Sequence, residues 1–202
     1  MHKTFTTILL LGSAVAAFAQ GTINFQNSFL TPISVRIWNP DGLTSVAVPT
    51  NFAVDYGVFA GTSAGSLSLV SPLLPSSTVA AGLVAAPTTA FAIPGSNPGE
   101  TTRFVQVRGW SASYGTDWEQ AEYDWSTGGN PGVVWGESAV ASGFALGPAA
   151  GPGYAIWQAA GGTNPAKLAP FTLTPYLLIP EPSTTALTGL GAAAVLIFRR
   201  RK

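Results

Sequence analysis

Two residue types that often carry chemistry are missing or nearly missing from this chain of 202 residues. It contains no cysteine, and its single histidine is His2. Without cysteine the chain has no disulfide, no thiolate metal site and no thiol nucleophile. If the N-terminus is removed, as expected below, a Ser-His-Asp triad, a histidine base and a histidine-ligated metal site are excluded as well. These absences remove most common enzyme classes.

Charge is also sparse, because Asp, Glu, Lys and Arg make up 9% of the residues. Between residues 20 and 179 there are four basic and eight acidic side chains, a net charge of −4, although the whole chain is formally neutral. Phosphate binding needs a basic face, so nucleic acid is not expected as a partner. The sequence offers no signal for a cofactor.

The first 19 residues have the pattern of a secretory signal peptide. A positive start at His2 and Lys3 precedes a mostly apolar stretch over 8–17. The stretch ends in a small-x-small site, with Ala17 and Ala19 as the small residues and cleavage expected before Gln20. Cleavage before Gln20 would remove the only histidine, and it predicts export by the Sec machinery.

The last 23 residues are the most informative part of the sequence. They begin with a Pro-Glu-Pro motif (Pro180, Glu181, Pro182), continue with an apolar stretch, and end in the basic tail Arg199, Arg200, Arg201 and Lys202. The short hydrophobic helix expected over 183–198 would be roughly 24 Å long, against about 30 Å of membrane hydrocarbon. It therefore suits a transient anchor better than a permanent one, with the cations on the cytoplasmic side.

This order of motif, hydrophobic segment and basic tail resembles the PEP-CTERM sorting signal of exported bacterial proteins. The resemblance implies that an exosortase, a membrane-embedded cysteine transpeptidase or protease, acts near the motif. It also implies an inner-membrane intermediate, then the cell surface or the extracellular space. Residues 21–27 and 104–110 are similar to exported PEP-CTERM proteins of Verrucomicrobia-like bacteria. The alternative is an ordinary C-terminal anchor that happens to contain Pro-Glu-Pro.

Between the two ends, residues 20–179 are long enough for one domain. Short extended runs alternate with Asn-Pro and Pro-Gly turn signals, which predicts an all-β sandwich or jelly-roll-like fold with one short helix. The predicted strands lie at 22–28, 33–38, 52–59, 66–70, 78–83, 88–93, 103–111, 132–140, 155–158 and 168–173. The last is expected at a sheet edge, because Pro170 lacks an N–H group.

Residues 103–111 show the clearest alternation. Val105 and Val107 share a small, mostly apolar face, whereas Gln106, Arg108 and Trp110 share a mixed one. This pattern is typical of a strand that lies between the core and solvent. Arg103 and Arg108 are expected to pair with nearby acidic side chains.

The helix is expected to begin after Asp117, a suitable N-cap with Gln120 at the capping-box position, and to stop at Gly128-Gly129. Trp118 and Trp125 are seven residues apart, so they fall on one face that can dock on the sheet. About eight residues are too few for an independent helix, which must therefore be held by packing.

Two groups of side chains in this domain are candidates for a site. The first holds four carboxylates in or beside the predicted helix: Asp117, Glu119, Glu122 and Asp124. They are interpreted as part of the helix scaffold, with a calcium site or a glycosidase carboxylate pair as alternatives. The second holds four tryptophans of the predicted strands, which either pack in the core or form a sugar-stacking row: Trp38, Trp110, Trp135 and Trp157.

Taken together, these features favour a non-enzymatic exported protein of the cell surface or extracellular matrix. One alternative is a carbohydrate-binding module for exopolysaccharide, which an exposed row of Trp and Tyr side chains would support. Another is a glycan-active enzyme, which two carboxyl groups facing each other across a cleft would support.

Overall fold

The computed structural model describes ten segments of the chain: residues 20–25, 36–38, 44–50, 52–76, 80–84, 90–130, 132–143, 145–148, 153–157 and 167–176. In these segments most of the regular structure is β-strand, joined by one α-helix, α2 (Trp118–Thr127), and one 3-10 turn, η1 (Ala112–Tyr114). The prediction of a β-rich domain with a single short helix is confirmed for the described residues.

The strands form two mixed sheets. The larger has the order β3-β2-β11-β9-β8-β4-β5, with β6 paired to β4, and the smaller has the order β10-β1-β7. The strands of the larger sheet are β2 (Arg36–Trp38), β3 (Ser45–Ala47), β4 (Val54–Ser63), β5 (Ser66–Leu69), β6 (Leu74–Pro75), β8 (Phe104–Ser111), β9 (Val134–Glu137) and β11 (Thr172–Pro175). Those of the smaller sheet are β1 (Thr22–Asn24), β7 (Phe91–Ala92) and β10 (Tyr154–Ala155).

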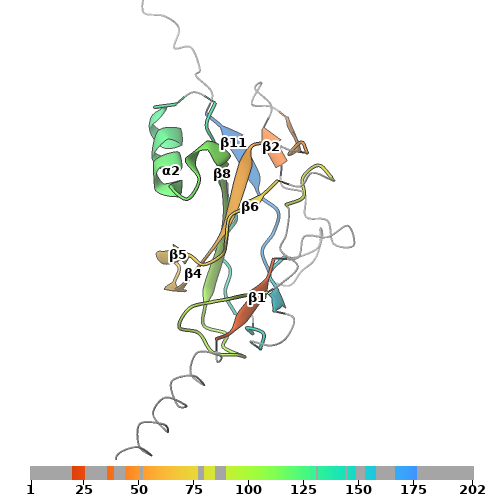
Figure 1. Ribbon diagram of the computed structural model, residues 1–202, viewed down its shortest axis with the longest axis vertical. Coiled ribbons are helices and arrows are strands. Elements are labelled where there is room, and N and C mark those ends of the chain that lie inside the picture. The colour runs from red at the N-terminus through yellow and green to blue at the C-terminus, as the bar shows by residue number, and fades with distance from the viewer. Residues whose placement is uncertain are drawn as a thin grey trace, which may run out of the picture.

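The antiparallel pair β4–β8 is the backbone of the fold. Its register runs without a break from Val54 opposite Ser111 to Gly61 opposite Phe104. Figure 1 shows these two strands along the length of the molecule, with β1 near one end and α2 and β11 near the other. The described chain therefore starts and finishes at opposite ends of the domain.

The larger sheet packs against different side chains on its two faces. Residues of one face, among them Tyr56, Val58, Val107 and Leu173, belong to a large core. This core also takes in Ile23 of β1 in the smaller sheet and Ile156, which directly follows β10. Residues of the other face, Phe59, Trp110 and Trp135, pack with Ala121 of α2. The first also contains Phe25, Tyr56, Trp157 and Phe171, but aliphatic side chains outnumber these rings, and we call it the aliphatic core. We call the second, with its partly buried neighbours Trp118 and Trp125, the aromatic cluster.

The prediction that the mixed face of 103–111 meets solvent is wrong. Gln106 and Trp110 on that face are 4% and 0% exposed, respectively. The reason is that α2 and the side chains of Leu67 and Leu69 cover this face. Alternation within one strand shows that it has two different faces, but it does not show what covers the second one.

The predicted strand 168–173 is displaced in the structure, and its expected edge position is wrong. The strand β11 begins at Thr172, after Pro170, and pairs with β2 on one side and β9 on the other. A proline before the first strand residue removes no ladder hydrogen bond, so it does not force the strand to the edge.

Smaller differences concern strand ends. Residues 80–82 form a turn and bend in place of the predicted strand 78–83, whereas β3 and β6 were not predicted. The strands near 52–59, 66–70 and 103–111 are found close to their predicted positions, although β4 continues to Ser63. The predictions for 26–28, 33–35, 78–79, 88–89 and 158 lie outside the described residues.

Candidate functional site

Helix α2 begins and ends as the sequence predicts. The Asp117 carboxylate accepts a hydrogen bond from the Gln120 N–H at 3.3 Å, which satisfies one of the free donors at the helix start. Gly128 ends the helix in the left-handed conformation, with φ of 74°. A Cβ atom at this position would lie 2.2 Å from the Tyr176 hydroxyl oxygen, so the close approach of this tyrosine also requires glycine.

The aromatic cluster under α2 is tightly interlocked. The rings of Trp118 and Trp135 stack with centroids 6.4 Å apart, and Phe59 meets Trp118 edge to face at 5.0 Å. The indole N–H of Trp110 donates to the Gly115 carbonyl at 2.8 Å, and that of Trp125 donates to the Thr174 carbonyl at 2.9 Å. These two bonds fix ring positions that hydrophobic contact alone would leave adjustable.

Arg108 lies within this cluster. Its guanidinium carbon is 4.6 Å from the ring centroids of both Phe59 and Trp118, within the range of a cation–π contact. The Arg108 Nε donates to the Gln106 side-chain oxygen at 2.9 Å and lies 3.5 Å from a Glu137 carboxylate oxygen. The expected pairing of this arginine with an acid is confirmed by the contact with Glu137. Its guanidinium also contacts the rings of Phe59 and Trp118 and the side chain of Gln106.

The four predicted carboxylates serve different purposes. Asp117 caps α2, and Asp124 accepts hydrogen bonds from the Tyr114 hydroxyl at 2.7 Å and the Gln120 amide at 2.6 Å. Glu119 and Glu122 are exposed. Within the described part of the chain, no group of three Asp, Glu, His or Cys side chains is placed to hold a metal ion. The calcium alternative thus gains no support from the geometry.

Three of the four predicted tryptophans are buried, so the picture of an exposed row does not fit them. Trp110 is 0% exposed, and Trp135 and Trp157 are 4% exposed. Trp157 belongs to the aliphatic core, where its ring stacks on Phe171 at 6.5 Å. The side chain of Trp38 lies outside the described residues. In the described part of the chain, the exposed large apolar side chains are Val46, Tyr123 and Val140.

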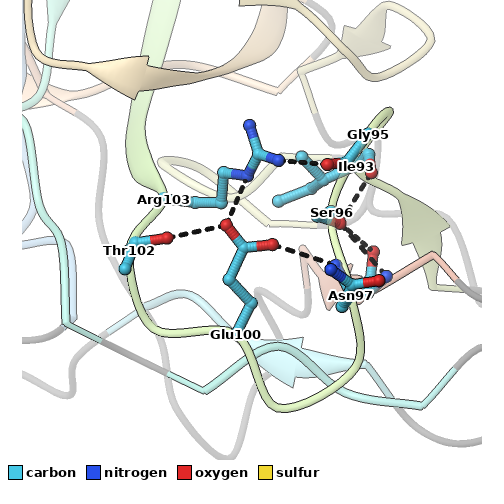
Figure 2. A network of polar contacts seen from close by, with 8 residues as sticks. Ile93, Gly95, Ser96, Asn97, Glu100, Thr102 and Arg103 are labelled. Atoms are coloured by element: carbon cyan, nitrogen blue, oxygen red, sulfur yellow. Dashed lines mark hydrogen bonds and ion pairs between the residues drawn. The ribbon is translucent and has the colours of Figure 1, made fainter.

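Glu100 is the centre of a second polar network, shown in Figure 2. Its carboxylate accepts hydrogen bonds from the Thr102 hydroxyl at 2.7 Å and the Asn97 N–H at 2.9 Å. These hydrogen bonds, with a further contribution from Arg103, hold the pKa of Glu100 below its usual range. The carboxylate therefore stays ionised and anchors the turn that leads into β8.

Arg103 completes this network and confirms the second expected arginine–acid pair. Its Nε lies 2.9 Å from a Glu100 carboxylate oxygen, as an ion pair whose N–H is not aimed well enough for a hydrogen bond. A terminal nitrogen of the guanidinium donates to the Gly95 carbonyl. The cation is thus neutralised by its own domain.

A cavity of about 250 Å³ lies beside Arg103, between the β4–β5 hairpin and the 93–94 turn. Besides Arg103, its walls combine small or hydroxyl-bearing residues with larger apolar ones. The first kind are Ala60, Gly61, Thr62, Ser66 and Ser68, and the second are Leu67, Val70, Ile93 and Pro94. No carboxylate lines it, so it does not provide the facing acid pair that glycoside hydrolysis requires.

The residues predicted to direct export lie mostly outside the described part of the chain. They are Ala17, Ala19, Pro180, Glu181, Pro182, Arg199, Arg200, Arg201 and Lys202, whereas Gln20 is described and lies just before β1. A comparison with protein families identifies the C-terminal residues of this set. Residues 178–202 match the model of the PEP-CTERM protein-sorting motif. The chain ends in a PEP-CTERM motif.

The PEP-CTERM motif implies an exported protein that is an exosortase substrate and is sorted to the cell surface. This finding confirms the resemblance drawn from the Pro-Glu-Pro sequence and the basic tail. No curated protein and no solved structure matches the chain. In the described residues, no helix is long and apolar enough to cross a membrane.

A backbone contact of Tyr176, which the sequence pattern does not predict, bears directly on this motif. The backbone N–H of Tyr176 donates to the Val133 carbonyl at 2.8 Å, and its carbonyl accepts from the Gly132 N–H at 3.4 Å. Only the position of this tyrosine, directly after a predicted strand and before the motif, could have indicated it. The domain therefore holds the chain firmly up to residue 176.

Proposed function

We propose that this chain is a non-enzymatic protein that is exported by the Sec machinery, processed by an exosortase, and displayed at the cell surface or in the extracellular matrix. The observation that carries the proposal is the match of residues 178–202 to the sorting motif. The described domain adds indirect support, since its prominent polar groups are engaged with one another: Asp124 with Tyr114, Glu100 with Arg103, and Arg108 with its cluster.

Mass spectrometry of the mature protein from its native host tests the proposal. We expect an N-terminus at Gln20 and a C-terminus between Pro180 and Ser183. A variant with alanine at Pro180, Glu181 and Pro182 is the matched control, and it should keep the basic tail and stay in the membrane fraction. Intact Arg199–Lys202 on wild-type protein recovered from the cell surface would contradict exosortase processing.

Association with exopolysaccharide belongs to the same proposal. An origin in a Verrucomicrobia-like bacterium is also proposed, and it rests only on the resemblance drawn from the sequence of residues 21–27 and 104–110. Affinity electrophoresis of the exported protein in gels containing the host exopolysaccharide tests the first point. Unchanged mobility in every gel would restrict the proposal to sorting and display. The glycan-active alternative is not retained as a proposal, because no observation on the described residues favours it.

A further inference from the structure

The folded domain holds the chain very close to its sorting motif. Tyr176 is hydrogen-bonded through both its N–H and its carbonyl to residues 132 and 133. Its hydroxyl also lies against Gly128 at the end of α2. Only three residues, 177–179, separate this fixed tyrosine from Pro180.

Covalent geometry then limits how far the motif can lie from the domain. A fully extended chain advances at most about 3.6 Å per residue, so Pro180 lies within about 14 Å of Tyr176. An enzyme that encloses Pro180–Pro182 is much larger than this distance. It must therefore meet the end of the domain where the described chain finishes, which is the end that carries α2 and β11 (Figure 1).

The surface at this end has a distinct composition. The exposed residues around the turn between α2 and β9 are Ser126, Thr127, Gly129, Asn130 and Gly132, and none of them is charged. The last turn of α2 has no basic residue, and the exposed charges elsewhere on the helix include the acidic Glu119 and Glu122. The turn itself offers no cation to anionic lipid headgroups, and the exposed Arg36 on the neighbouring strand β2 is hydrogen-bonded to Ser45. The chemistry of the turn therefore fits a protein contact better than a lipid contact.

We propose that this surface, Ser126, Thr127, Gly129, Asn130 and Gly132, contacts the exosortase while the enzyme acts on the motif. The inference rests on the proposed function, since it names the part of the domain that the processing enzyme meets. Small, uncharged side chains let the enzyme approach Pro180 without removing Tyr176 from the fold. A bulky side chain on this surface then obstructs processing, although it lies outside the motif.

A substitution of Gly129 tests this contact in the full-length chain. A Cβ at this position meets its nearest neighbour, an Asp124 carboxylate oxygen, at 3.4 Å, so Gly129→Trp can be accommodated on the surface. Gly65→Trp is the matched control, because Gly65 is an exposed glycine of the β4–β5 turn and a Cβ added there would meet no atom within 4 Å. We expect Gly129→Trp to slow removal of the tail by about tenfold in pulse-chase experiments, and Gly65→Trp to match the wild type.

A second variant separates obstruction from damage to the fold. Ten Gly and Ser residues inserted between Ile179 and Pro180 extend the reach of the motif by up to about 36 Å. This insertion should restore processing of Gly129→Trp. Wild-type rates for Gly129→Trp alone, or no rescue by the insertion, would overturn the proposed contact. An intact tail on the wild-type chain would instead refute exosortase processing itself, whatever the variants show.

Discussion

The two faces of the larger sheet are held by different physical means. On one face the aliphatic core joins both sheets through side chains such as Ile23, Val107 and Leu173, which offer shape but no hydrogen bonds. On the other face a few large rings are fixed by two indole N–H bonds and by an arginine between two of them. The comparison shows that the two sheets are held together mainly by aliphatic packing, with a few ring contacts such as Phe25–Trp157. Helix α2 is held instead by an aromatic cluster that includes directed indole hydrogen bonds.

The largest expected effect is the loss of a ring from the aromatic cluster. Trp110→Ala should lower the free energy of unfolding by about 3–5 kcal/mol, because the ring is fully buried and its removal leaves a cavity. Trp118→Ala should cost less, about 1–3 kcal/mol, since this ring is only partly buried. Chemical denaturation of both variants checks the order.

In the aliphatic core, Leu173→Ala supplies the comparison. Leu173 is 0% exposed, and we expect a loss of about 2–5 kcal/mol. If the aromatic variants lost helix signal in circular dichroism before global unfolding and Leu173→Ala did not, the two regions would be separate cooperative units. A single shared transition in every variant would show that the sheet couples its two faces.

The next effect concerns Arg108. Arg108→Lys should lower stability by about 1 kcal/mol, because an ammonium group cannot reproduce the planar contact with two rings. Glu137→Gln should change stability by only a few tenths of a kcal/mol, since Glu137 is half exposed and surface ion pairs contribute little. Equal losses in thermal melts of the two variants would mean that the ion pair, rather than the ring contact, holds the arginine.

A smaller effect is expected at the start of α2. Asp117→Ala removes the N-cap acceptor and should cost about 1 kcal/mol. Glu119→Gln is the matched control, with an expected loss of at most a few tenths of a kcal/mol, because Glu119 is exposed. Urea titrations followed by far-UV circular dichroism distinguish the two. A larger loss for Glu119→Gln would show that this carboxylate has a role beyond the helix start.

The smallest effect at neutral pH is expected in the aliphatic core, at Tyr56. Burial raises the pKa of Tyr56 to about 12, whereas an exposed tyrosine titrates near pH 10. Because the unfolded chain loses this proton first, the stability contributed by the protonated hydroxyl is lost as the pH rises from about 10 toward 12. Tyr56→Phe should therefore change little at pH 7 and lose less stability than the wild type at about pH 11. Tyr123→Phe, at an exposed position, is the control for both thermal melts.

The local features of this domain were largely predictable from sequence. The Asp117 cap, the Gly128 stop and the shared face of Trp118 and Trp125 depend on neighbours within about two helical turns, and the structure confirms them. The two arginine–acid pairs were also expected, because acids are close to Arg103 in sequence and the domain is acidic. The sorting motif was equally predictable, since it is defined by the order of Pro-Glu-Pro, apolar segment and basic tail along the chain.

Long-range arrangement was not predictable from one sequence. The place of β11 between β2 and β9 depends on pairing Thr172 with Arg36, far away in the chain. The burial of Gln106 depends on Ser138, because the side-chain amide of Gln106 donates a hydrogen bond to the Ser138 carbonyl at 3.0 Å. A local sequence pattern identifies neither Arg36 as the partner of Thr172 nor Ser138 as the partner of Gln106. For the same reason the sequence did not predict that α2, Leu67 and Leu69 cover the mixed face of β8.

The interior position of β11 also limits when the larger sheet can be completed. The larger sheet cannot be closed until Thr172–Pro175 is available to join β2 to β9. These residues are among the last to be synthesised before the sorting motif, which the family match places from residue 178. The strand that completes the larger sheet and the motif that the exosortase recognises are therefore synthesised one directly after the other. Until these residues are available, β2 and β3 have no strand that joins them to β9 and the rest of the larger sheet.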